Sequence, residues 1–315
     1  MSLSPLPPEK RPLHRAWNLA RGSLFTAFLF VTLIAGNASQ MLSVLVLRPF
    51  SARAFRWFNR NMADQWWGMC DRLGQTIYRI RFTITGDDLP VQENAIVVAN
   101  HQQMTDIPAI FHIARKKKRL GDLKWYVKDI IKYVPGVGWG MLFLDCLFIK
   151  RDWAEDKEGI EAVFRKVHTH KIPLWIINFV EGTRFSEKKV KKSQAFAQER
   201  NLPVLHHLLT PRTKGFVATV EGLRGHASAV YDFTIGYKEG VPTLWHWISG
   251  RVREVHLHVR RFRMEDLPEA REQLADWLHR LYAEKDQLLE QYRNGVFPAH
   301  LAAPVPVVRD REPLV

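Results

Sequence analysis

His101 and Asp106 are the pair of side chains in this sequence best suited to chemistry. They stand between an apolar run at 95–99, typical of a buried strand, and a helical pattern that begins near residue 106. We expect Thr105 to cap this helix. A loop and one turn would bring the carboxylate back to the imidazole, where it binds one ring nitrogen and leaves the other free as a general base. The pair would activate a hydroxyl, although this spacing alone is too common to identify a function.

Two arginines stand where later strands are expected to end. The apolar run at 144–149 leads to Arg151, and the run at 174–180 leads, through a Gly that permits a tight turn, to Arg184. A guanidinium can bind a phosphate through two parallel hydrogen bonds. Both arginines are therefore candidates for binding a phosphorylated ligand.

The remaining patterns complete an α/β domain. A fourth strand is expected at 203–205, ahead of Pro211, and strands at 230–237 and 255–259 and an amphipathic helix at 267–292 follow. We predict an α/β fold with a mixed central sheet flanked by helices. Ligands of such sheets bind at the carboxyl ends of the strands, so four apolar runs that are each followed by polar residues point to one site.

A strong excess of positive charge limits the choice of partner. The chain carries 46 Lys and Arg residues against 32 Asp and Glu residues, a net charge of +14. This excess favours an anionic partner, either nucleic acid or membrane headgroups, and basic runs at 115–119 and 188–192 would form a basic face. No recognised nucleic-acid motif is present. The two cysteines, Cys70 and Cys146, are too few for a disulfide framework, and no Cys/His spacing typical of a metal site occurs.

The N-terminal segment favours the membrane. Residues 22–47 carry no charge, are rich in Leu, Phe, Val and Ile, and have basic residues on both sides. As one helix they could cross a ~30 Å hydrocarbon core. The polar sequence at 36–40 and the two basic flanks fit a re-entrant or interfacial hairpin at least as well. A cleavable signal peptide is a third interpretation, although the apolar run resumes at Met41. We expect a membrane-embedded or interfacial helical element over residues 1–60.

Four blocks of the sequence resemble, in order, those of the glycerolipid acyltransferases, the 1-acylglycerol-3-phosphate acyltransferase family. The blocks are Asn100-His101 with Asp106, Phe148-Ile149-Lys150-Arg151, Phe179-Val180-Glu181-Gly182-Thr183-Arg184 and Leu209-Thr210-Pro211. Residues 274–298 resemble the branch that contains lysocardiolipin acyltransferase. Two residues depart from the family's pattern: Gln103 stands where Ser is common, and Val180 stands where Pro usually precedes the Glu.

This resemblance implies an enzyme without cofactor or metal that takes an acyl group from acyl-CoA or acyl carrier protein. His101 would act as general base on the free hydroxyl of a lysophospholipid, in the first place 1-acylglycerol-3-phosphate, and Asp106 would orient the imidazole. Arg184 and Arg151 would bind the acceptor's phosphate. The other substrate-binding residues that it implies are Lys128, for phosphate or the developing oxyanion, and Glu181, Gly182, Thr183 and Pro211, with Glu181 and Thr183 shaping the Arg184 loop.

The organisation that we expect is an acyltransferase domain at 61–298 and a flexible tail at 299–315. The protein would be on a membrane, the inner one if it is bacterial, with its site facing the cytoplasm. Two alternatives are an acyltransferase for a lysophospholipid with a larger headgroup and a membrane-tethered lipid-binding protein without turnover. Locally, we expect a helical stretch at 124–133, and we expect His256 and His258 to be surface residues.

Overall fold

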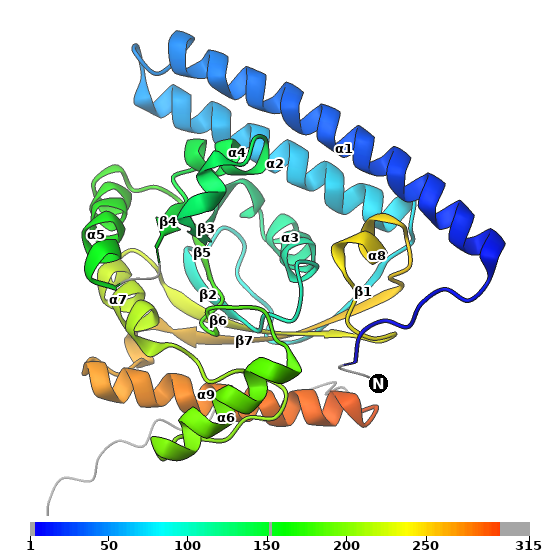
Figure 1. The fold of residues 1–315 in the computed structure, drawn as a ribbon. Coiled ribbons are helices and arrows are strands. Elements are labelled where there is room, and N and C mark those ends of the chain that lie inside the picture. Colours follow the sequence, from blue (N-terminus) through cyan, green and yellow to red (C-terminus); the bar gives the residue numbers. More distant parts are fainter. Residues whose placement is uncertain (1–3, 151–152, 297–315) are drawn as a thin grey trace, which may run out of the picture.

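The computed structural model describes residues 4–150 and 153–296, and a mixed seven-stranded sheet runs through its centre (Figure 1). The strand order is β1-β7-β6-β2-β5-β3-β4. Strands β2 to β6 run parallel to one another, whereas β7 is antiparallel to β6 and β1 is parallel to β7. The predicted mixed central sheet is therefore confirmed. The strands are β1 (Arg81–Gly86), β2 (Ala95–Ala99), β3 (Leu123–Lys128), β4 (Leu147–Ile149), β5 (Trp175–Asn178), β6 (Ala229–Tyr237) and β7 (Glu254–Arg263).

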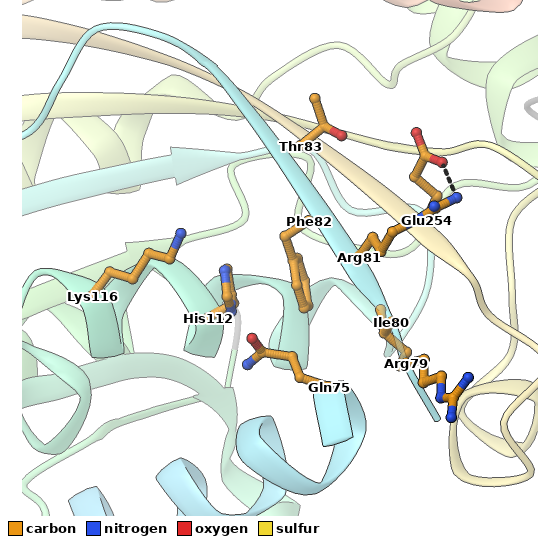
Figure 2. Close-up of a pocket in the computed structure, with 9 residues that line it drawn as sticks. All are labelled: Gln75, Arg79, Ile80, Arg81, Phe82, Thr83, His112, Lys116 and Glu254. Atoms are coloured by element: carbon orange, nitrogen blue, oxygen red, sulfur yellow. Dashed lines mark hydrogen bonds and ion pairs between the residues drawn. The ribbon is translucent and has the colours of Figure 1, made fainter. Parts of the chain in front are cut away.

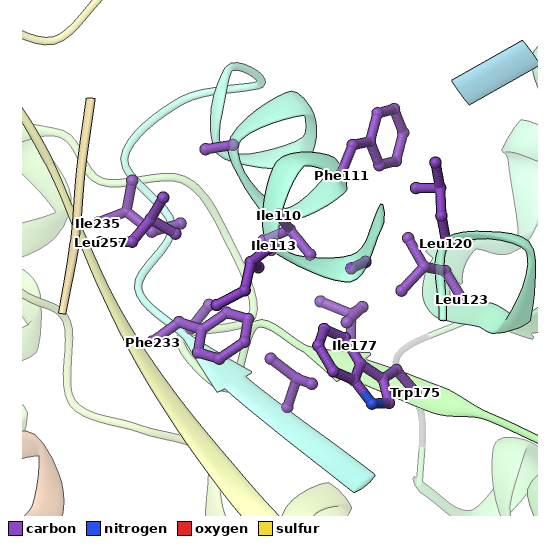
Figure 3. Close-up of a cluster of buried hydrophobic side chains, with 14 of the residues drawn as sticks. Ile110, Phe111, Ile113, Leu120, Leu123, Trp175, Ile177, Phe233, Ile235 and Leu257 are labelled. Atoms are coloured by element: carbon purple, nitrogen blue, oxygen red, sulfur yellow. The ribbon is translucent and has the colours of Figure 1, made fainter. Parts of the chain in front are cut away.

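Helices cover both faces of the sheet because its central strands are apolar on both sides. Side chains of β2 alternate between two cores: Val97 belongs to the core of α3, whereas Ile96 and Val98 belong to the core under α5, α7 and α9. Figure 3 shows the first core, with Ile110 and Ile113 of α3 over the sheet. The helices are α1 (Pro12–Val46), α2 (Ala52–Thr76), α3 (Asp106–Lys116), α4 (Val137–Phe143), α5 (Trp153–His170), α6 (Glu187–Glu199), α7 (Thr213–Leu223), α8 (Leu244–Ile248) and α9 (Arg271–Arg293), with 3-10 turns η1 (Leu120–Asp122), η2 (Asp129–Tyr133) and η3 (Met264–Asp266).

The predicted strand-to-helix junction forms between β2 and α3. All five residues of β2 are buried, and α3 begins at Asp106. The side chain of Asn100 exchanges two hydrogen bonds with the backbone of Ile235, at 3.0 and 2.8 Å, and so ties the end of β2 to β6. Thr105 occupies the predicted N-cap position of α3, but its hydroxyl donates to the carbonyl of Pro242 at 3.1 Å instead of accepting from a helix N–H.

Two local predictions are wrong. The stretch from residue 124 to 128 is strand β3, and helical structure is limited to η2. Aromatic and β-branched residues at 125–127 suit a strand, and pairing with both β5 and β4 fixes that conformation. No strand forms at 203–205 in the described chain; Pro203 has no N–H for a ladder, and Val204 is exposed. The strands expected at 230–237 and 255–259 are present as β6 and β7.

The apolar N-terminal segment forms one continuous helix, α1, which packs against α2 as a helical hairpin (Figure 1). Within the described residues, α1 is the one helix long and apolar enough to cross a membrane. The expected boundary at residue 60 falls inside α2, whose Ala63 and Trp67 belong to the core that also contains α3. The expected tail at 299–315 lies outside the described residues.

The break at 36–40 that a re-entrant hairpin would require is absent, because α1 runs unbroken from Pro12 to Val46. Asn37 and Gln40 are buried, and their side chains bond to each other at 3.1 Å. One turn later the Ser43 hydroxyl accepts a hydrogen bond from the Asn59 side chain of α2, also at 3.1 Å. These polar groups do not end the helix because they have partners inside the hairpin, and the Ser43–Asn59 bond joins its two helices.

Candidate active site

The site centres on His101 and Asp106, which the β2–α3 junction brings into contact. The Nδ1 atom of His101 lies 3.0 Å from Oδ2 of Asp106. Because a carboxylate accepts, Nδ1 carries the proton and Nε2 has a free lone pair. Among the described residues Nε2 has no hydrogen-bond partner, and the His101 side chain is 13% exposed. The pair has the geometry of an oriented general base that substrate can reach.

Asp106 is held by two further hydrogen bonds. Its Oδ2 atom also accepts from the backbone N–H of Gln103 at 2.8 Å, and its Oδ1 atom accepts from the hydroxyl of Tyr237 at 2.7 Å. Asp106 is fully buried, so each bond has large consequences for its orientation. Burial raises the pKa of Tyr237 well above its usual value, which keeps the phenol protonated as a donor.

Sequence reasoning missed Tyr237. It is 131 residues from Asp106 and closes β6, which lies beside β2 in the sheet. Like the predicted site residues, it stands at the end of an apolar strand, and that position is the signal that could have identified it.

The imidazole of His101 is fixed by stacking as well as by Asp106. Its ring lies 4.0 Å from that of Phe179, centre to centre, with 16° between the planes. Phe179 follows β5 and contacts Trp125 of β3, with ring centres 6.2 Å apart. A row of rings therefore connects His101 to the neighbouring strands and restrains rotation of the imidazole.

Glu181 is buried beneath the site and binds backbone groups of its loops instead of facing solvent. It is buried, and its two oxygens accept backbone N–H bonds from His101 at 2.8 Å and from Leu209 at 3.1 Å. Burial outweighs these bonds and raises the pKa of Glu181 to about 8. Glu181 thus joins three loops: the one after β2, its own after β5, and the one before α7.

The loop after Glu181 has little freedom. Gly182 has a φ of +70°, and a Cβ atom there would lie 2.8 Å from Nε of Arg212, so both backbone and space require glycine. The ammonium of Lys189 donates to the hydroxyl of Thr183 at 2.7 Å and to the carbonyl of Arg184 at 2.9 Å. The loop therefore presents Arg184 from a fixed position.

Arg184 is exposed and reaches the His101 loop. Its Nη1 atom donates to the side-chain oxygen of Gln103 at 2.9 Å, while the backbone of Gln103 contacts Asp106. The departure from the family's pattern at Gln103 thus lies beside the expected phosphate-binding arginine. Lys128 is exposed at the end of β3, at the same carboxyl edge of the sheet, whereas the predicted Arg151 lies outside the described residues.

The segment before α7 is anchored by the C-terminal helix. Asp286 of α9 accepts from the backbone N–H groups of His206 and His207, the latter at 2.7 Å. Pro211 follows and is buried, and the next residue, Arg212, donates its backbone N–H to Val180 at 2.7 Å. Pro211 is therefore placed to shape the site's wall.

A second His–Asp pair lies on the other side of α3, and its surroundings distinguish it from the first. His112 contacts Asp71 at 3.1 Å, but Asp71 is shared with Arg115, and the buried imidazole stacks on Phe82 with ring centres 3.8 Å apart. His112 and Phe82 line an open hollow of about 790 Å³, where Arg81 is paired with Glu254 (Figure 2). The His112–Asp71 pair is therefore structural, because its carboxylate is shared with Arg115 and its imidazole is stacked and buried.

The basic run at 115–119 does not form one basic face. Arg115 is paired with Asp71, and Arg119 is buried against Asp122 at 3.0 Å and backbone carbonyls. These two cations stabilise the fold because their charges are matched internally, and they are not available to an anionic partner.

The prediction that His256 and His258 are surface residues is wrong. Both are buried in β7; His256 bonds Glu254 at 2.7 Å and His258 bonds Thr85 at 2.9 Å. The sequence did not reveal that β1 pairs with this strand, or that Tyr292 of α9 packs on His256 with ring centres 5.2 Å apart. Across the described residues, no cluster of His, Cys, Asp and Glu could hold a metal ion.

Comparison with known proteins gives consistent matches. The sequence family described as Acyltransferase matches residues 81–238, and the family described as Acyltransferase C-terminus matches residues 246–313. The chain is 34% identical to 1-acyl-sn-glycerol-3-phosphate acyltransferase 3 of Arabidopsis thaliana, over 81% of this chain and 70% of that protein. It is also 34% identical to the human gamma enzyme of the same name, over 87% of this chain and 75% of that protein.

A solved structure has the same fold. The crystal structure of the 1-acyl-sn-glycerophosphate acyltransferase PlsC from Thermotoga maritima superposes with a TM-score of 0.52 at 17% identity, covering 88% of this chain and 98% of that chain. The resemblance to the lysocardiolipin branch is not specifically supported by these relatives and stays a prediction.

Proposed function

This chain belongs to the acyltransferase family and is a glycerolipid O-acyltransferase, and on that premise we propose that it acylates 1-acylglycerol-3-phosphate to phosphatidic acid. The acyl donor is a thioester of coenzyme A or acyl carrier protein. The observation that carries the proposal is the His101–Asp106 pair, which lies at the carboxyl edge of the sheet on a loop whose Gln103 contacts Arg184.

In the reaction, Nε2 of His101 takes the proton of the acceptor's free hydroxyl while the oxygen attacks the thioester carbonyl. Asp106 stabilises the imidazolium that forms, as in other oriented His–carboxylate pairs. The tetrahedral intermediate then collapses, an ester bond replaces the C–S bond, and the departing thiolate takes the proton back from His101. The thiol and the diacyl product leave, and the base is regenerated.

Arg184 would bind the phosphate of the acceptor. The guanidinium can exchange its single bond to the neutral Gln103 amide for a bidentate contact with phosphate, in which donor and acceptor are both charged. Lys189 fixes the loop through its bonds to Thr183 and to the carbonyl of Arg184, and it adds a second positive charge. Buried Glu181 fixes the backbone on which both His101 and this loop depend.

The acceptor would come from a membrane on which α1 lies flat. Contacts between α1 and the rest of the protein extend from Arg21, bonded to the carbonyl of Ser249, to Ser43, bonded to Asn59. Attachment of α1 along its length supports an interfacial position, in which its exposed apolar residues would enter the leaflet. The basic residues at both ends favour the cytoplasmic side.

The test is product analysis with purified protein. A panel of lysolipids, including 1-acylglycerol-3-phosphate and species with larger headgroups, would be offered with labelled acyl-CoA and, separately, acyl carrier protein. We expect phosphatidic acid to form, and His101→Ala and Asp106→Asn to reduce turnover by about 100- to 10,000-fold. His170→Ala, at an exposed position on α5, is the control and should keep full activity.

Three results would contradict the proposal. Preferential acylation of a lysolipid with a larger headgroup would show that 1-acylglycerol-3-phosphate is not the acceptor. Lysolipid binding without any product would indicate a binding protein. Near-normal rates of the His101→Ala protein with every donor would exclude the His101–Asp106 pair as the base.

A further inference from the structure

The segment 129–143, made of η2, a short connection and α4, exposes an unusual number of large apolar side chains. Ile130 is 64% exposed and Tyr133 is 67% exposed. Further exposed apolar residues in this segment are Val134, Val137 and Leu142. Single exposed apolar residues are common on protein surfaces, but five within thirteen residues form a patch of the kind that marks an interaction site.

The polar residues of this segment suit an anionic partner. Lys128, which precedes it, is exposed at the end of β3. The one acidic residue at its start, Asp129, is neutralised by Lys132 at 2.8 Å. Apolar residues beside an exposed lysine match the chemistry of a bilayer leaflet that contains anionic lipid, since the apolar side chains enter the acyl layer and the cation meets the headgroups.

The segment continues the apolar surface of the N-terminal hairpin. Leu33 of α1 packs directly on Gly136, where an added Cβ would lie 2.8 Å from the leucine. At the other end of the segment, Phe143 contacts Phe55 of α2, with ring centres 6.4 Å apart. Figure 1 shows α4 beside α1 and α2. A leaflet that receives the exposed face of α1 therefore also lies close to this segment.

The same segment leaves the sheet next to the site. It follows β3, which is parallel to β5, so it begins at the carboxyl edge where His101 also lies. The rings of Trp125, on β3, and Phe179 form a continuous row to His101. Lipid bound at this segment is thus on the side of the molecule from which the acceptor's hydroxyl must reach His101.

We propose that residues 129–143 insert into the interfacial layer of an anionic bilayer, in the same leaflet as α1, and hold the open edge of the site against the membrane. The occupant of the patch is the lipid bilayer, not a second protein. This inference rests on the proposed function, because it assigns the route by which a membrane-resident acceptor reaches His101.

Fluorescence of the full-length protein tests the insertion directly. An environment-sensitive dye would be attached to Tyr133→Cys in a Cys70→Ser background, since Cys146 is buried. Phe196→Cys, at an exposed apolar position on α6, is the matched control. With vesicles of phosphatidylcholine and phosphatidylglycerol, the dye at position 133 should shift to the blue and be quenched by bromolipids. The dye at position 196 should do neither.

Activity provides the second measurement. The double variant Ile130→Ser, Tyr133→Ser should lose about tenfold or more in turnover of acceptor embedded in vesicles, and much less with a short-chain acceptor below its micellar concentration. The matched variant Phe196→Ser should keep both activities. Equal losses on the two forms of acceptor would overturn the proposal, because they would indicate damage to the site and not to docking.

The outcomes separate this inference from the proposed function. A dye at position 133 that stays in water on vesicle-bound, active enzyme refutes the docking segment alone. A dye that inserts while no lysolipid is acylated supports docking and refutes the assigned reaction. A blue shift that appears without lipid and grows with protein concentration would show that a second copy covers the patch, and would also overturn the proposal.

Discussion

Replacing Tyr237 with Phe removes one hydroxyl and tests how strongly the third partner of Asp106 contributes to catalysis. The hydroxyl donates to Oδ1 of Asp106 at 2.7 Å, and both side chains are almost fully buried. A hydrogen bond to a charged group contributes about 1.5–3 kcal/mol to stability. Tyr237→Phe should therefore lower the free energy of unfolding by about this amount, because Oδ1 has no other partner among the described residues.

The catalytic effect follows from orientation. Without the Tyr237 hydroxyl, the Asp106 carboxylate can rotate and its alignment with Nδ1 of His101 weakens. Loss of about 1.4 kcal/mol of transition-state stabilisation corresponds to a tenfold slower rate. We expect kcat to fall by about tenfold or more and KM for both substrates to change little, since no substrate contact is removed.

A control for this variant lies on the same strand. Tyr231 is also buried in β6 and also donates to a carboxylate, that of Glu93, but at the opposite end of the strand. Tyr231→Phe should destabilise the fold comparably and leave kcat near that of the wild type. Denaturant unfolding and steady-state kinetics on both variants provide the comparison, and equal kcat values for the two would refute the reasoning.

Three further predictions concern the loop that carries Arg184. Arg184→Lys should raise the acceptor KM while the donor KM changes little, and Arg184→Ala should do worse; a defect confined to the donor would mean that Arg184 holds the donor's phosphates. Gly182→Ala should destabilise the fold by about 1–3 kcal/mol in denaturant, because the φ of +70° and the contact with Arg212 exclude a Cβ, whereas Gly215→Ala, with open space around it, should not. Burial raises the pKa of Glu181 from 4.5 to about 8, so the folded protein binds a proton there that the unfolded chain does not. Stability should fall as pH rises from about 4.5 to 8, and Glu181→Gln should flatten this dependence; superimposable pH profiles would argue against it.

The sequence alone predicted the features that depend on neighbours along the chain. The apolar run at 95–99 and the helical periodicity after it located β2 and α3, and the five-residue separation was enough to expect contact between His101 and Asp106. A connection of five residues has few conformations, so the local sequence is enough to predict contact between these two side chains. The matching blocks likewise located Arg184 on a loop after a strand.

Local patterns failed where partners distant in the sequence decided the outcome. The polar sequence at 36–40 is compatible with a break, yet α1 continues. Asn37 and Gln40 bond to each other inside the hairpin, and Asn59 of α2 bonds to Ser43 one turn later. The stretch after residue 124 was expected to be helical, but pairing with β5 and β4 makes residues 124–128 a strand. His256 is buried because other elements cover β7.

Tertiary structure decided which side chains hold His101 and Asp106 in position. Tyr237 reaches Asp106 across 131 residues of sequence, and Glu181 reaches the backbone of His101 across 80. Neither contact follows from spacing, because the strand order of the sheet, and not the order of the chain, makes β2, β5 and β6 neighbours. The sequence therefore determined which groups we expect to perform the chemistry, whereas the sheet decided what holds them in place, since hydrogen bonds act over about 3 Å wherever their partners lie in the chain.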